Sequence, residues 1–143
     1  MGKPHPHGDP HIRQLLHFRY RGTERILFVD DETAILKVNK IRLERLGYHV
    51  TAQNSSKDAL ALFAQQPDAF DLIITDMTMP ELTGEALAKE CFSIRSDIPI
   101  ILCTGYSDII SETKAKGIGI REYVMKPILV KDLAQAIRRA IEN

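Results

Sequence analysis

Short apolar runs alternate along this chain with longer segments whose apolar residues recur at helical spacing. We predict that the runs are β-strands at residues 26–29, 48–52, 72–75, 98–103 and 120–125. Two of the intervening helical stripes consist of Ile35, Leu36, Leu43 and Leu46, and of Val130, Leu133, Ile137 and Ile141. Five strands that alternate with five helices predict an α/β fold, in which helices cover both faces of a parallel sheet.

The strand order follows from the same runs. A central parallel strand is apolar on both faces, whereas an edge strand shows alternation. The first, third and fourth runs are continuously apolar, but "YHVTA" and "EYVM" alternate, so we expect the second and fifth strands at the edges. This predicts a flavodoxin-like, doubly wound sheet of order 2-1-3-4-5, whose functional site lies beyond the carboxyl ends of the first and third strands.

Helix ends are indicated by individual residues. Ser55 or Ser56 is placed to cap the second helix, because a serine oxygen accepts from the free N–H groups of a first helical turn. Gly47 and Gly117 are placed where the first and fourth helices are expected to stop.

The length and charge of the chain indicate one domain preceded by a tail. Its 143 residues, 44% of them apolar, fit a single globular domain at residues 24–143, and the Pro-, Gly- and His-rich residues 1–23 read as a tail or linker. Residues 1–22 hold four of the 19 bases and one of the 19 acids, which leaves 15 bases and 18 acids. A mildly acidic body offers no basic face for nucleic acid.

The sequence predicts neither a membrane-spanning segment nor a disulfide. No apolar stretch reaches membrane-spanning length, and the first residues lack the apolar core of a secretory signal, so we expect a cytoplasmic protein. Cys91 and Cys103 have no Cys-x-x-Cys spacing, which favours buried, reduced thiols over a disulfide or a zinc site.

Three acids follow two neighbouring strands at the edge where the site is expected. Asp30 and Asp31 end the first apolar run and Asp76 ends the third. Two unit charges about 4 Å apart repel by about 4 kcal/mol at an effective dielectric constant near 20. A cation relieves that repulsion, and Mg²⁺ prefers carboxylate oxygens together with water and phosphate oxygens. Lys126 and Thr104, which end the fifth and fourth runs, add an ammonium group and a hydroxyl.

Four segments, each at a strand end and in this order, carry a resemblance to a known family: "VDDE", "ITDMTMPELTG", "LCTGYSD" and "YVMKP". Over residues 24–142 the chain resembles the response-regulator receiver domain of two-component signalling. The resemblance implies that Asp76 accepts a phosphoryl group, and that Thr104 and Lys126 contact its oxygens. It implies a Mg²⁺ site made by Asp30, Asp31, Asp76 and the backbone carbonyl of Thr78. It also implies a switch residue, Tyr123, and a cis bond between Lys126 and Pro127.

The resemblance has further implications for partners. The phosphoryl group would come from a phosphohistidine of a sensor histidine kinase or of a histidine phosphotransfer domain, and the domain would catalyse only its own phosphorylation and dephosphorylation. Because "GTERILFVDDE" and "ILCTGYSD" look similar to C-terminal receivers of hybrid sensor kinases, we expect that origin over a stand-alone regulator. The fourth helix, "SDIISETKAKG", has a thin apolar side made by Ile109, Ile110 and Ala115, so we expect it to move on phosphorylation. A partner or a second copy of the chain would bind there and at the fifth strand.

Three other functions compete with this interpretation. A haloacid-dehalogenase-type phosphatase also uses a strand-terminal aspartate, but it normally has a second aspartate at the position of Thr78. A flavodoxin-like cofactor binder needs a Ser-, Thr- or Gly-rich loop where this chain has "DDET". A receiver fold that serves only protein contacts is the third alternative.

Each site residue also has a purely structural interpretation. An acid can cap the first helix, Thr104 can be an ordinary strand residue, Lys126 a solvated lysine and Tyr123 an edge-strand packing residue.

Overall fold

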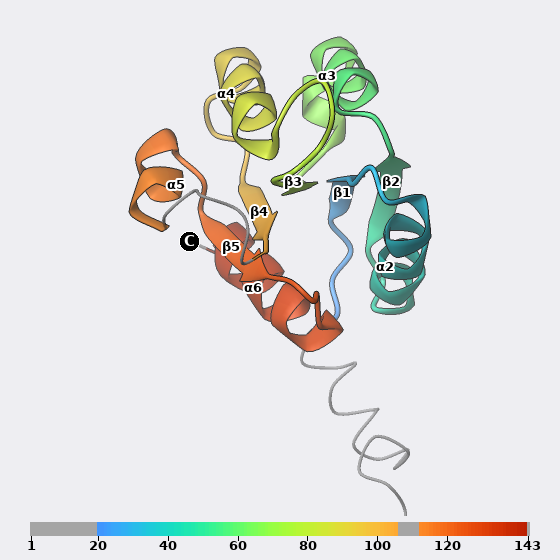
Figure 1. The fold of residues 1–143 in the computed structure, drawn as a ribbon. Coiled ribbons are helices and arrows are strands. Elements are labelled where there is room, and N and C mark those ends of the chain that lie inside the picture. Colours follow the sequence, from blue (N-terminus) through green and yellow to red (C-terminus); the bar gives the residue numbers. More distant parts are fainter. Residues whose placement is uncertain (1–19, 106–111, 143) are drawn as a thin grey trace, which may run out of the picture.

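The computed structural model of the chain describes residues 20–105 and 112–142, without the side chains of residues 112, 113 and 115 (Figure 1). The strands are β1 (Arg25–Val29), β2 (His49–Gln53), β3 (Leu72–Asp76), β4 (Ile100–Thr104) and β5 (Glu122–Met125). The helices are α2 (Thr33–Arg45), α3 (Ser56–Gln65), α4 (Gly84–Ile94), α5 (Glu112–Ile118) and α6 (Val130–Glu142), with a short 3-10 helix, η2 (Pro67–Ala69). Within the described ranges, none of the helices combines the length and the apolar character that crossing a bilayer requires.

The sheet has the predicted order, β2-β1-β3-β4-β5, and every neighbouring pair of strands is parallel. The fourth and fifth strands begin two residues later than predicted. Ile98 and Ile120 are buried, but they precede the first paired residues of β4 and β5. Their apolar side chains therefore indicated burial and not strand pairing.

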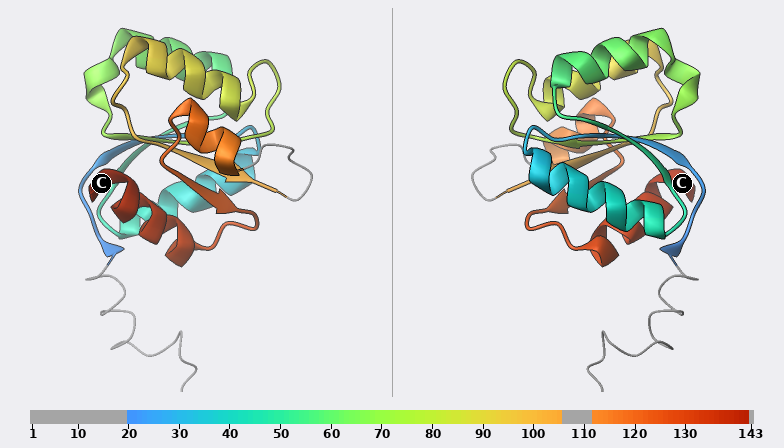
Figure 2. Two further views of the ribbon diagram at one scale, coloured as in Figure 1. Left: turned by 90° about the vertical axis from the view of Figure 1, so that its left-hand side faces the viewer. Right: turned by 90° about the vertical axis from the view of Figure 1, so that its right-hand side faces the viewer.

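Two apolar layers enclose the sheet, as Figure 2 shows with α3, α4 and α5 on one face and α2 and α6 on the other. Alternate β1 residues enter opposite layers, because successive side chains of a strand point to opposite faces. Ile26 and Phe28 pack with Leu36, Leu43, Leu133 and Ile137, whereas Leu27 and Val29 pack with Ala59, Phe63, Leu87 and Cys91. Cys91 and Cys103 are both buried and unpaired thiols, as predicted.

The predicted helix ends are partly correct. The Ser55 hydroxyl accepts from the backbone N–H of Asp58, and Gly47 follows α2 with a φ of 103°. The prediction for Gly117 is wrong, because this residue lies inside α5 and the chain turns at Gly119, which has a φ of 115°. Ile109 and Ile110 of the predicted apolar side lie outside the described residues, as does the side chain of Ala115.

Residues immediately before β1 pack against the domain. Tyr20 is buried, its carbonyl oxygen accepts from the Tyr48 hydroxyl, and its own hydroxyl accepts from the side-chain amide of Gln135. The backbone N–H of Gly22 donates to the carbonyl oxygen of Leu46. The described part of the predicted tail is thus joined to the turn between α2 and β2 and to α6, while residues 1–19 lie outside the described ranges.

Candidate functional site

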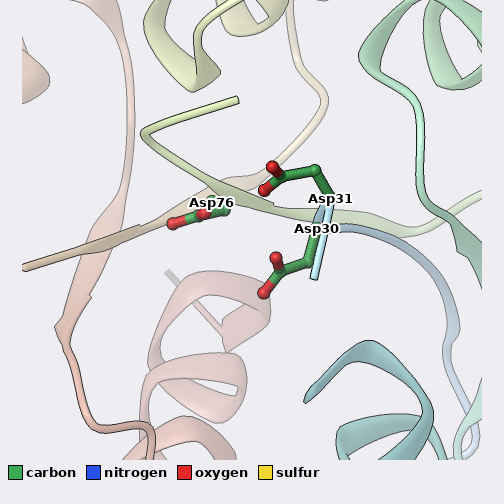
Figure 3. A group of neighbouring side chains, drawn as sticks. All are labelled: Asp30, Asp31 and Asp76. Carbon is green, nitrogen blue, oxygen red and sulfur yellow. The ribbon is translucent and has the colours of Figure 1, made fainter. Parts of the chain in front are cut away.

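Three carboxylates meet at the carboxyl ends of β1 and β3. Val29, the last residue of β1, pairs with Thr75, so Asp30 and Asp76 are the next residues on adjacent parallel strands. One oxygen of each of Asp30, Asp31 and Asp76 lies within 4.8 Å of the others. Figure 3 shows Asp30 and Asp31 leaving the end of β1 beside Asp76. The fold therefore brings together the acids that the sequence placed at the point where the strand order reverses.

Burial makes these charges costly. Asp30 is 0% and Asp76 is 2% exposed, whereas Asp31 is exposed. Burial raises the pKa of Asp30 to about 6, although the backbone N–H of Glu32 donates to its Oδ1 at 2.9 Å and opposes the shift. Burial also raises the pKa of Asp76, and the ammonium group of Lys126 partly offsets that effect.

Lys126 brings a cation to the acids from the end of β5. Its Nζ lies 2.7 Å from Oδ1 of Asp76, and its backbone N–H donates to the carbonyl oxygen of Thr104. Burial acts to lower the pKa of Lys126, but the hydrogen bond and charge of Asp76 outweigh it and raise that pKa. The bond between Lys126 and Pro127 is cis, as the resemblance implied.

The remaining predicted residues surround this pair. Thr104 ends β4, is 4% exposed, and donates its hydroxyl proton to the thioether sulfur of Met125 at 3.3 Å. Tyr123 is half-buried against the apolar layer beneath α3 and α4. Thr78 is exposed in the loop after β3, two residues beyond Asp76.

Two residues that hold the loop after β3 were not predicted as site residues. The Ser56 hydroxyl donates to the carbonyl oxygen of Pro80 and accepts from the N–H of Leu82. Gly84 donates its N–H to the carbonyl oxygen of Met77, and a Cβ at Gly84 would lie 2.3 Å from the carbonyl oxygen of Asp76. Gly84 lies in the segment "ITDMTMPELTG", so the sequence holds a signal for it, whereas for Ser56 the sequence predicts only a possible helix cap.

The donor set fits a hard divalent cation. Oδ2 of Asp30 is inaccessible to solvent and has no hydrogen-bond partner among the described residues. A cation bound among the three acids would give this buried carboxylate oxygen a partner and offset the repulsion between the charges. Oxygen donors at this spacing suit Mg²⁺ better than the softer metals that select nitrogen or sulfur.

The profile of the response regulator receiver domain matches residues 26–138. The chain belongs to the response regulator receiver family. Its acidic pocket of Asp30, Asp31 and Asp76 is consistent with phosphoacceptor signalling. This membership argues against the two alternatives from outside the family, the phosphatase and the flavodoxin-like cofactor binder.

This chain is similar in sequence to regulators from other organisms. It is 37% identical over 122 residues to "Probable transcriptional regulator ycf27" of Guillardia theta, covering 84% of this chain and 46% of that protein. It is 34% identical over 109 residues to "Two-component response regulator ARR10" of Arabidopsis thaliana, covering 76% and 20%. This receiver thus spans about half, or less, of the length of these relatives.

A solved receiver domain from Clostridium thermocellum has the same fold. It superposes with a TM-score of 0.79 at 36% identity, covering 83% of this receiver and 94% of that chain. The structure described as FixJ-N superposes with a TM-score of 0.74 at 29% identity, covering 85% and 96%.

Proposed function

We propose that this receiver takes a phosphoryl group from a phosphohistidine of a partner onto Asp76. A carboxylate oxygen of Asp76 forms a bond to phosphorus while the nitrogen–phosphorus bond of the histidine breaks, and the resulting acyl phosphate is later hydrolysed within the domain. The observation that supports the proposal most is the position of Asp76, a buried carboxylate between two acids and a lysine at the end of a central strand.

The neighbouring residues are placed to stabilise charge on the transferred group. Asp30, Asp31, Asp76 and the backbone carbonyl of Thr78 would hold Mg²⁺, which supplies positive charge toward the phosphoryl oxygens when bound. In the transfer, Lys126 would move its ammonium group from the Asp76 carboxylate to a phosphoryl oxygen. Thr104 would donate its hydroxyl proton to another, because phosphoryl transfer depends mainly on positioning and charge neutralisation.

Labelling by acetyl phosphate tests the proposal. We expect intact-mass measurement to show one added phosphoryl group on the wild type with Mg²⁺ present and none without it, because an anionic donor is repelled by three carboxylates. Asp76→Asn should stay unlabelled, while Asp71→Asn, which alters an acid at the opposite end of β3, should label like the wild type. Equal labelling of wild type and Asp76→Asn would place the acceptor elsewhere.

This receiver has a surface beside the site on which we propose that the phosphodonor protein docks. A groove of about 630 Å³ runs from Lys126 along α2 and is lined mainly by apolar side chains. Ile35, Val38 and Leu129 are exposed apolar residues in or next to the groove. We place a helix of the histidine-bearing partner here, because a phosphohistidine must reach Asp76 from a surface adjoining Lys126.

The donor, the location and the parent protein of this receiver are also proposals. A sensor histidine kinase or a histidine phosphotransfer domain remains the expected donor, and the cytoplasm the expected location. The hybrid-kinase origin gains no support from the relatives above, which are described as regulators. Binding of a partner or a second copy at α5 and β5 also stays a prediction, as does the absence of direct binding to nucleic acid or membrane.

A further inference from the structure

The hydroxyl group of Thr104 is engaged by a sulfur atom in this structure. Thr104 and Met125 are paired residues at the ends of β4 and β5. The Thr104 hydroxyl donates to the Met125 thioether at 3.3 Å. Thr104 is 4% exposed, whereas Met125 is 45% exposed, so a buried donor meets an acceptor whose side chain reaches the surface.

This contact competes with the role assigned to Thr104 under the proposed function, on which the present inference rests. A threonine hydroxyl has one proton. That proton can be donated to the Met125 sulfur or to an oxygen of a phosphoryl group carried by Asp76, but not to both. A thioether is a weak acceptor, so a phosphoryl oxygen, which forms charge-assisted hydrogen bonds, displaces it readily. Met125 therefore positions Thr104 in the unphosphorylated state.

We propose that Met125 is a site of reversible oxidation that controls the movement of Thr104. A peroxide transfers one oxygen atom to the thioether sulfur: the sulfur is oxidised by two electrons to a sulfoxide, and hydrogen peroxide is reduced to water. The S=O oxygen is a far stronger acceptor than the thioether. It holds the Thr104 hydroxyl away from Asp76, which slows phosphorylation and opposes the switch.

Exposure favours Met125 over the other methionines that the structure describes. Met79 is 7% exposed and Met77 is half-buried in the apolar layer. Both cysteines are buried, and burial raises the pKa of the Cys91 thiol to about 12, so neither is a reactive thiolate near neutral pH. A dilute peroxide should thus modify Met125 first.

The first test needs no phosphoryl transfer. After limited treatment with hydrogen peroxide, peptide mass mapping should find one added oxygen on Met125 before Met77 or Met79. The ε-methyl NMR signal of Met125 should differ between wild type and Thr104→Val, in which an isosteric methyl replaces the donor. Oxidation of Met77 or Met79 ahead of Met125, or an unchanged methyl signal, would overturn the proposal whether or not Asp76 is the acceptor.

The second test measures the rate of labelling by acetyl phosphate with Mg²⁺. Oxidised wild type should label about fivefold more slowly than reduced wild type, the factor that one hydrogen bond of typical net strength supplies. A methionine sulfoxide reductase should restore the rate. Peroxide should leave the rate of Met125→Leu at its own untreated value, and Met77→Leu should respond like the wild type.

Thr104→Ala separates the hydroxyl contact from general damage. If the sulfoxide acts through the hydroxyl, oxidation of Met125 in this variant should not change its labelling rate. Equal slowing of wild type and Thr104→Ala would show that the hydroxyl is not involved and would overturn the proposal. Absence of labelling on Asp76 in the reduced wild type would instead contradict the proposed function.

Discussion

Nζ of Lys126 lies 2.7 Å from Oδ1 of Asp76, so a cation from the edge strand neutralises the carboxylate at the end of a central strand. Asp76 is 2% exposed, and the side chain of Lys126 is 26% exposed. Burial raises the pKa of Asp76, and the ammonium group of Lys126 opposes that rise by stabilising the charged carboxylate.

Removing this cation should affect both stability and chemistry. We expect Lys126→Ala to lower the free energy of unfolding of the metal-free protein by about 1–2 kcal/mol, because a buried carboxylate loses its charged partner. Labelling by acetyl phosphate should slow by at least about tenfold, the loss typical for one group that stabilises developing charge. Urea unfolding and timed mass spectra measure the two effects. Lys131→Ala, on the exposed side of α6, is the control, and equal values for both variants would contradict the role of Lys126.

Removing one buried acid should have opposite effects without and with metal. Asp30→Asn should raise the free energy of unfolding of the metal-free protein by about 1 kcal/mol, because it removes a buried charge whose Oδ2 has no partner among the described residues. Added Mg²⁺ should stabilise the wild type and have little effect on the variant. Thermal unfolding with and without Mg²⁺ checks this. The same Mg²⁺ response in Asp30→Asn and wild type would refute a metal site at Asp30.

The backbone at the end of β3 leaves no room for a side chain at Gly84, the first residue of α4. Gly84→Ala should lower the free energy of unfolding by about 2 kcal/mol, because the new Cβ would lie 2.3 Å from the carbonyl oxygen of Asp76. Gly117→Ala is the matched control. Its Cβ would have no neighbour within 4 Å, so alanine in this helix should stabilise by about 0.5–1 kcal/mol. Denaturant unfolding compares the two, and a harmless Gly84→Ala would contradict the close approach.

The switch should depend on the hydroxyl of Thr104. Thr104→Ala should still accept a phosphoryl group on Asp76, but more slowly, because one donor to the phosphoryl oxygens is lost. Phosphorylation should then no longer change the hydrogen exchange of residues 112–124, which include α5 and Tyr123. Such coupling requires an element with two arrangements, not mere proximity. If the phosphorylated variant shows the changes of the phosphorylated wild type, Thr104 is not the relay.

The groove along α2 should determine transfer from a protein donor but not from a small one. Val38→Asp should slow transfer from a phosphorylated histidine phosphotransfer domain by about tenfold or more, because it places a charge in an apolar contact. Labelling by acetyl phosphate should be unchanged. Ile41→Asp alters an equally exposed apolar residue of α2 that does not line the groove. An unchanged rate of transfer from the donor protein to Val38→Asp, or equal slowing with Ile41→Asp, would argue against this docking surface.

Local patterns were sufficient to predict the fold. The apolar runs predicted the strands and their order, because a strand buried on both faces differs in sequence from an edge strand. The same order fixed the edge at which Asp30, Asp31 and Asp76 meet. The less accurate predictions concern boundaries: Ile98 and Ile120 are buried outside the strands, and the turn after α5 is at Gly119 and not at Gly117.

The sequence by itself thus determined the topology and the position of the acidic cluster. The apolar pattern of each strand is a local property, and it fixes the order of the strands and therefore the edge at which the acids meet. Only the tertiary structure decided which neighbours these residues have. The hydrogen bonds of Ser56 to the loop after β3, the packing of Tyr20 on α6 and the contact of Thr104 with Met125 join residues 21 or more positions apart. No periodic pattern encodes such contacts, because each depends on the directions of two side chains after the sheet and helices have packed.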